Sequence, residues 1–201
     1  MPNVINSESL ELSDTWKKAD TGLLETPEKR CSGDVRVLVL GLGNILLKDE
    51  GVGVHVAECL QKKDLPDNVE IIDGGTSGLD VLLSQRPPYR LLVIDAIKAG
   101  RKPGTVYKTQ LKRGEKERVT QIFNELGQSN ISLHQVGLLD ALRAAEKLER
   151  MPEEITIIGL EPAEVSLGLE LTEPVKQSVP RVVEQVLEEI QDAVHREQAH
   201  R

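Results

Sequence analysis

Two carboxylates and one histidine are the side chains of this sequence that could do chemistry together. Glu50 lies in the stretch GLGNILLKDEGVG, Asp95 ends the apolar stretch LLVID, and His134 lies in SLHQVG. Two carboxylate oxygens and one imidazole nitrogen form an open set of three ligands for a borderline divalent cation, with water or substrate filling the remaining positions. The sequence therefore predicts a metal site made of these three residues.

Each of these residues also has a structural interpretation. A carboxylate at the end of a buried strand, such as Asp95, is either hydrogen-bonded to loop amides or bound to a cation. The dipole at the start of a helix favours acids, so we expect Asp49 to cap the helix that begins here and Glu50 to complement its positive end. The pattern SLHQ is typical of a capping box, which puts His134 in a first helical turn, where the ring stays neutral. A lone histidine there is more often structural than a ligand, so both interpretations stay open.

Alternating strands and helices must position these side chains. Apolar runs predict strands at 35–40, 69–72, 90–95, 104–110 and 154–160, and helical patterns occupy about 50–62, 78–85, 115–126, 133–149 and 174–196. This order predicts an α/β fold with right-handed crossovers and a mainly parallel sheet that is covered on both faces. Functional groups gather beyond the carboxyl ends of such strands, so the acidic residues and His134 are expected at one edge of the sheet.

The glycine-rich stretch at residues 41–53 matches a dinucleotide-binding unit only in part. The pattern G-x-G-x-x-G is met at Gly41 and Gly43 but broken at Leu46, and the helix that should receive a phosphate begins with Asp49 and Glu50. Two carboxylates would repel a phosphate. The sequence also has no Walker A loop, and GTSGL lacks the last glycine of a serine-hydrolase elbow. A non-catalytic nucleotide-binding or regulatory α/β module remains the alternative function.

Composition and charge exclude several classes of protein. The 201 residues allow one domain with a sizeable core, and the single Trp, two Tyr and single Phe leave that core to aliphatic side chains. A net charge of -8, with no cluster of basic and aromatic residues, argues against nucleic acid as a partner. No apolar run approaches the roughly 20 residues that a membrane-spanning helix needs. We therefore expect a soluble, cytoplasmic protein with no membrane span.

The chain divides into an extension and one domain. Residues 1–33 are polar and lack periodicity, which predicts a flexible N-terminal extension, and residues 34–197 are expected to form a single domain followed by a tail at 198–201. The two cysteines have neither metal-site spacing nor a disulfide framework, which is typical of a reducing compartment.

Successive blocks of the sequence resemble one family. The blocks GLGNILLKDEGVG, IIDGGTSGLDVL, LLVIDAIKAG, SLHQVGLLDAL and ITIIGLEPAEVSLGLELTEPV are similar, in this order, to those of the hydrogenase maturation endopeptidases. The resemblance implies a three-layer α/β/α fold with a twisted sheet of about five strands. It also implies a protease that removes a C-terminal peptide from the large-subunit precursor of a nickel-iron hydrogenase once nickel has been inserted.

The resemblance also implies roles for individual residues. The family's metal ligands fall on Glu50, Asp95 and His134, and the cation is expected to be nickel carried by the substrate, for which another divalent cation could substitute. Asp73 matches the family's D-G-G block. It is a candidate for substrate contact or catalysis, or else a loop aspartate that bonds the amides of its neighbours. Gly74 and Gly75 would let this loop come close to a peptide substrate.

Two mechanisms stay open. In the first, the ion polarises the scissile carbonyl and activates water, while Asp73 or Asp49 moves the proton. In the second, the ion only docks the substrate, and the carboxylates act alone as in an aspartic protease.

Overall fold

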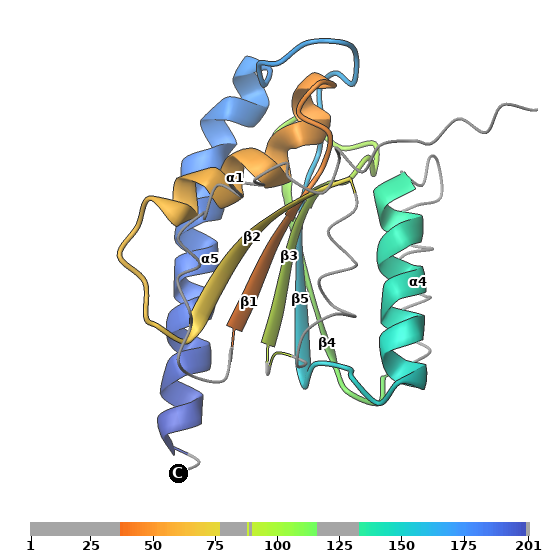
Figure 1. The fold of residues 1–201 in the computed structure, drawn as a ribbon. Coiled ribbons are helices and arrows are strands. Elements are labelled where there is room, and N and C mark those ends of the chain that lie inside the picture. The colour runs from red at the N-terminus through yellow and green to blue at the C-terminus, as the bar shows by residue number, and fades with distance from the viewer. Residues whose placement is uncertain (1–36, 77–87, 89, 116–132, 200–201) are drawn as a thin grey trace, which may run out of the picture. The chain divides into compact units, whose positions relative to one another are not determined.

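Five strands form one sheet in the order β2-β1-β3-β5-β4 (Figure 1). The computed structural model describes residues 37–76, 88, 90–115 and 133–199, so the predicted extension at 1–33 and most of the predicted helices at 78–85 and 115–126 lie outside the described residues. The strands are β1 (Val37–Leu42), β2 (Val69–Gly75), β3 (Arg90–Ala96), β4 (Val106–Lys112) and β5 (Glu154–Leu160). The expected five-stranded, mainly parallel sheet is confirmed.

The edge strand β4 is antiparallel to β5, whereas the other neighbours in the sheet are parallel. The connection at 97–105 between β3 and β4 is too short for a crossover, which takes about a dozen residues or more. The chain therefore turns back at the carboxyl end of β3 and runs along the edge of the sheet in the opposite direction.

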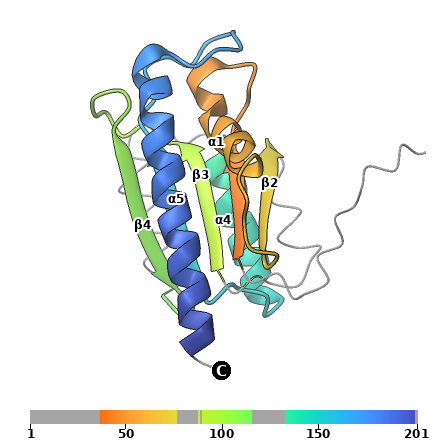
Figure 2. The same cartoon turned by 90° about the vertical axis from the view of Figure 1, so that its left-hand side faces the viewer.

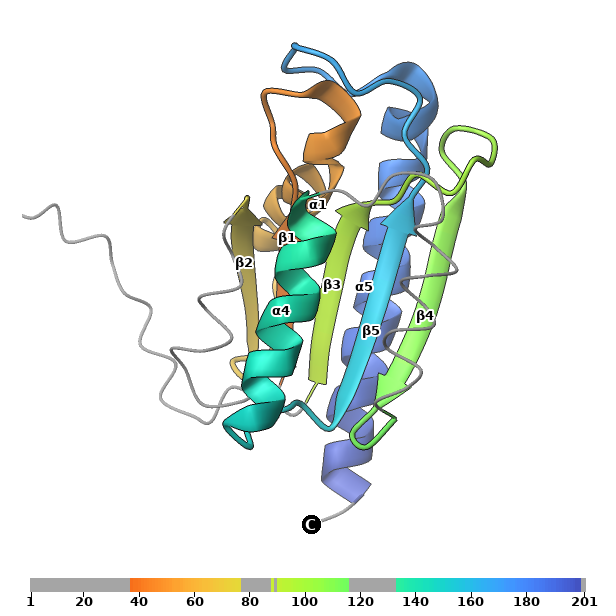
Figure 3. The ribbon, with the colours of Figure 1, turned by 90° about the vertical axis from the view of Figure 1, so that its right-hand side faces the viewer.

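Helices cover both faces of the sheet. The 3-10 helix η2 (Lys48–Gly51) leads into α1 (Val52–Gln61), and α4 (Leu133–Lys147) and α5 (Glu173–Ala199) follow later in the chain. Figure 2 shows α1 and α5 in front of one face, and Figure 3 shows α4 in front of the other. Val37 and Val39 of β1 pack on the side of α5, and Leu38 and Leu40 on the side of α4. Both faces are buried, which explains the continuous apolar runs of the strands. None of the described helices is long and apolar enough to cross a membrane.

The glycines of residues 41–53 allow close packing. A Cβ at Gly41 would lie 2.2 Å from the carbonyl oxygen of Gly53, and a Cβ at Gly53 would lie 2.2 Å from that of Ile94. Gly43 has a φ of 135°, and a Cβ there would lie 1.9 Å from the carbonyl oxygen of Glu50. Helix α1 can therefore lie directly against β1 and β3. This packing accounts for the glycines that resemble a dinucleotide-binding pattern.

Several predicted boundaries differ from those of the structure; the strands expected at 35–40 and 104–110, for example, are Val37–Leu42 and Val106–Lys112. The strand expected at 69–72 continues to Gly75, because Asp73 and Gly75 pair with the end of β1. The helix expected from residue 50 begins as η2 at Lys48 and becomes α-helical only at Val52. Lys48 itself has a φ of 50°, a left-handed conformation that is uncommon outside glycine.

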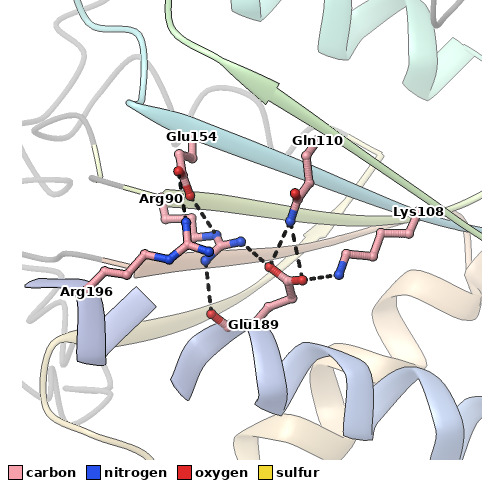
Figure 4. A network of polar contacts seen from close by, with 6 residues as sticks. All are labelled: Arg90, Lys108, Gln110, Glu154, Glu189 and Arg196. Carbon is pink, nitrogen blue, oxygen red and sulfur yellow. Dashed lines mark hydrogen bonds and ion pairs between the residues drawn. The ribbon is translucent and has the colours of Figure 1, made fainter. Parts of the chain in front are cut away.

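A network of charged side chains joins α5 to the amino-terminal end of the sheet (Figure 4). Arg90, the first residue of β3, contacts the carboxylate of Glu189 on α5, and its Nε lies 3.7 Å from Oε2 of Glu154. Glu189 also pairs with Lys108 and accepts a hydrogen bond from Gln110. Both Arg90 and Glu189 are buried. The network therefore gives a buried carboxylate two cationic partners from the same chain.

Candidate active site

The structure brings three predicted elements to the carboxyl edge of the sheet. β1 and β3 are parallel neighbours, so the segment that leads into η2 starts beside the end of β3. Helix α4 leads back to the start of β5, and Figure 3 shows that it begins near the carboxyl end of β3. His134 therefore lies in the first turn of a helix at this edge, as predicted, whereas its side chain lies outside the described part of the structure.

Asp95 is a buried acid at the end of β3. The residue is only 3 % exposed, and Oδ1 of its carboxyl group accepts a hydrogen bond of 2.8 Å from the amide of Ala96. Burial raises the pKa of Asp95 to about 8; the hydrogen bond from Ala96 opposes this rise, and the nearby carboxylate of Glu50 adds to it. The amide contact, which was one interpretation offered by the sequence, is therefore present at the end of β3, whereas the binding of a cation by Asp95 remains a prediction. A cation between the two carboxylates would favour their ionised forms.

Asp49 has a different place from the one expected. Neither η2 nor α1 has a side-chain capping bond, so the prediction that Asp49 caps this helix is wrong. Its buried carboxylate instead accepts hydrogen bonds from the amides of Ala163, Glu164 and Thr172 and from the Thr172 hydroxyl, at 2.7–3.0 Å. These contacts give Asp49 a structural role in holding the connection between β5 and α5. Its part in proton transfer remains a prediction.

The same connection holds the segment before η2. The amide of Lys48 donates to the carbonyl of Gly168 at 2.9 Å, and the amide of Gly168 donates to the carbonyl of Leu46 at 3.0 Å. Lys48 also forms an ion pair of 2.7 Å with Glu164. These contacts stabilise the unusual backbone of Lys48 and, with it, the position of Glu50 two residues later.

Asp73 is exposed at the end of β2. Its Oδ1 accepts a hydrogen bond of 2.9 Å from the amide of Gly75, and the carbonyl of Gly75 accepts one of 2.9 Å from the amide of Gly43. The structure thus contains the amide contact that was one interpretation of Asp73. Its catalytic role and the approach of a peptide to Gly74 and Gly75 remain predictions.

Glu161 is a residue of this edge that the sequence analysis did not select. It follows β5 directly, is buried, and accepts hydrogen bonds from the amides of Ala99 and Gly100 at 2.9 and 3.0 Å and from the hydroxyl of Tyr107. Burial raises the pKa of Glu161, but these hydrogen bonds outweigh it, and the pKa ends below its usual value. Glu161 therefore fixes the loop that follows Asp95. Glu161 could have been selected from the sequence, because it follows an apolar strand and the same rule selected Asp95.

The metal site depends on all three predicted ligands. Among the side chains that the structure describes, no group of three His, Cys, Asp or Glu is arranged to hold a metal ion. Glu50 and Asp95 supply two carboxylates at one place, and only the imidazole of His134 would complete the predicted set. The three-ligand metal site therefore remains a prediction.

Comparison with protein families assigns this three-layer fold to a class of peptidases. Residues 54–189 match the family model of the hydrogenase maturation proteases. The chain belongs to this family, and it is therefore a hydrolase that cleaves peptide bonds.

Individual relatives agree with this assignment. Over 172 residues the chain is 37% identical to the hydrogenase 2 maturation protease of Escherichia coli K12, with 83% of this chain and 99% of the relative covered. It is 41% identical over 151 residues to the hydrogenase expression/formation protein HupD of Rhizobium leguminosarum bv. viciae, with 74% of this chain and 71% of the relative covered. The resemblance seen in the sequence blocks is confirmed.

Solved structures show the same fold. The hydrogenase maturating endopeptidase HybD of E. coli superposes with a TM-score of 0.69 at 36% identity, covering 79% of this chain and 93% of HybD. The nickel-iron hydrogenase maturation protease HybD of Thermococcus kodakarensis gives a TM-score of 0.61 at 32% identity, covering 76% of this chain and 97% of that one. The predicted α/β/α architecture is therefore that of known maturation proteases.

Proposed function

We propose that this protein removes the C-terminal extension of the large-subunit precursor of a nickel-iron hydrogenase after nickel has been inserted. In this proposal the nickel of the precursor binds to Glu50, Asp95 and His134, and its presence marks the precursor as ready for cleavage. Relatives named as maturation proteases of hydrogenase 2 and of a nickel-iron hydrogenase support this choice of substrate. Two cysteines without a disulfide framework support the cytoplasm as the compartment.

The observation that carries the proposal is the buried carboxyl of Asp95 beside Glu50. An ionised carboxylate in this place is disfavoured both by burial and by the like charge of its neighbour. A divalent cation would remove both penalties, because it attracts the two carboxylates at once. A nickel ion carried by the substrate would therefore stabilise the two ionised carboxylates, whereas an acidic or a neutral group of the substrate would not.

Proton transfer is assigned to Asp73 rather than to Asp49. Hydrolysis of a peptide bond requires a group that takes a proton from water and a group that gives one to the leaving amine. Asp73 is exposed at the carboxyl edge, whereas the carboxylate of Asp49 is buried among four hydrogen-bond donors. An exposed carboxylate can exchange protons with water during turnover. The metal-assisted and the aspartic mechanism both keep this role for Asp73.

The test compares nickel-loaded and nickel-free precursors. The purified protein should release a C-terminal peptide, detected by mass spectrometry, from the loaded precursor and not from the nickel-free one. Asp95→Asn should slow release by at least about a hundredfold, since losing even the groups that only orient a metal ligand costs roughly 10–100-fold. Asp67→Asn is the matched control, because it makes the same change in the connection between α1 and β2 at the opposite edge. Equal cleavage of both precursors would contradict the role of nickel.

A further inference from the structure

We propose that an exposed apolar strip beside the candidate active site docks an apolar segment of the precursor that is flanked by basic residues. The apolar strip consists of Ile45, Leu46, Val165, Leu167 and Leu169. This inference rests on the proposed function, because it concerns the substrate of the same site. It adds a surface that would hold the precursor apart from the metal ligands.

Two connections at the carboxyl edge form the strip. One joins β1 to η2 and the other joins β5 to α5, and the two lie side by side in the views of Figure 1 and Figure 3. The hydrogen bonds between Leu46, Lys48 and Gly168 and a β-bridge between Leu47 and Gly168 join them. The four hydrogen bonds that Asp49 accepts fix the connection between β5 and α5 to η2. The strip is thus formed before any partner binds, which keeps the entropy cost of docking low.

The side chains of the strip face solvent. Leu167 is 84% exposed, Leu169 64% and Leu46 56%. Val165, Leu167 and Leu169 are exposed, whereas Ser166 and Gly168 between them are less exposed. Contiguous exposed apolar side chains of this kind mark interaction sites. In the described part of the chain, Leu148 is the other large apolar side chain with such exposure, and it lies at the opposite edge, between α4 and β5.

The position of the strip identifies the occupant as the substrate. Leu46 precedes Glu50 by four residues, and the two connections that form the strip also hold η2 in place. The reaction of the family cleaves a peptide bond in a protein, so polypeptide on one side of the bond must cross the surface next to the acids. The apolar strip is continuous with that surface.

Charge at the rim of the strip favours the same occupant. Glu170 is exposed on the connection that carries Leu167 and Leu169, Glu173 is exposed at the start of α5, and the chain as a whole has a net charge of -8. A second copy of this chain would bring the same acids against one another, and an anionic lipid surface would be repelled. An apolar segment with basic flanks meets both the strip and its rim.

The experiment replaces two leucines of the strip by a neutral polar residue. Leu167→Ser combined with Leu169→Ser should raise the KM for the nickel-loaded precursor by about tenfold or more, as expected for the loss of central apolar anchors of an interface. Leu148→Ser is the matched control and should change KM by less than about twofold. The melting temperatures of both variants should stay close to that of the original protein, because these side chains are exposed. The double variant Leu167→Met, Leu169→Met keeps apolar side chains at both positions and should have the KM of the original protein.

Direct binding separates this inference from the proposed function. If the original protein binds the precursor in a calorimetric titration and the double serine variant does not, the docking surface is supported even where no peptide is released. An unchanged KM in the serine variant would overturn the inference. So would a sedimentation experiment in which the original protein is a dimer that these substitutions dissociate, or binding to anionic vesicles that they abolish. If the KM does not rise with salt concentration, the docked segment of the precursor is not held by basic flanking residues, and that part of the inference is wrong.

Discussion

Both ends of β3 bury an ionisable side chain, but the groups that surround it differ between the two ends. At the amino-terminal end, Arg90 contacts Glu189, and Lys108 gives the same carboxylate a second cation (Figure 4). At the carboxyl end, burial raises the pKa of Asp95 to about 8, and the one charge among the described residues that acts on it, the carboxylate of Glu50, adds to this rise. A buried acid with cations from its own chain is part of the architecture. A buried acid near a second acid lacks such a partner among the causes that act on its pKa, which is why we propose that a cation from the substrate binds there.

Removing the acid at the amino-terminal end should have the largest effect on stability. Glu189→Ala leaves Arg90 buried without its closest counter-charge, and breaking a buried ion pair in this way costs about 3–5 kcal/mol in the free energy of unfolding. Urea denaturation measures this loss. Glu188→Ala, at the exposed neighbouring position, should change the free energy of unfolding by no more than about 0.5 kcal/mol. Equal losses in the two variants would show that the network has no special role.

Removing the acid at the carboxyl end should instead change how stability depends on pH. Because the pKa of Asp95 is about 8 in the folded protein and near its usual 3.8 in the unfolded chain, the folded state binds more protons between these values. The stability of the original protein should therefore fall as pH rises from about 4 to about 8. Asp95→Asn should remove this part of the decline, measured as urea midpoints at pH 5 and pH 8. An identical decline in both proteins would contradict the burial of an ionisable Asp95.

Replacing Glu161 should have a smaller effect with the opposite dependence on pH. Glu161→Gln weakens the hydrogen bonds to Ala99, Gly100 and Tyr107, which should cost about 1–3 kcal/mol. The pKa of Glu161 is lowered by folding, so its contribution is complete above the usual pKa of a glutamate and is lost as pH falls through the folded value. The difference from the original protein should therefore be full at pH 7 and shrink at pH 3. Glu188→Gln, at an exposed position, serves as the control and should change the free energy of unfolding by no more than about 0.5 kcal/mol at pH 7.

The strand pattern explains why the sheet could be predicted from the sequence, and the strand-end rule explains why Asp95 could be placed at its carboxyl edge. The apolar run that ends in Asp95 can be read from the sequence alone, and such a run is typical of a strand buried in the middle of a sheet, where β3 lies. β5 was predicted with the bounds that the structure has, because Glu154 begins and Leu160 ends a run of apolar residues.

The failures concern contacts between distant parts of the chain. Asp49 bonds residues that lie 114 to 123 positions away, and Arg90 bonds Glu189 at a separation of 99. A helix start with an acid looks the same in sequence whether the acid caps the helix or holds a distant loop. Local patterns therefore predicted which elements meet at the carboxyl edge but not which side chains hold that edge together.

The most direct test of the central claim is a calorimetric titration of the protein with Ni²⁺ at pH 7, repeated in two buffers of different ionisation enthalpy. The account predicts binding of one ion together with release of a proton, because the cation must displace the proton of Asp95. In Asp95→Asn the proton release should vanish and the affinity should fall by about tenfold or more. Binding of Ni²⁺ with the same affinity and the same proton release in the variant would show that the cation meets the protein elsewhere.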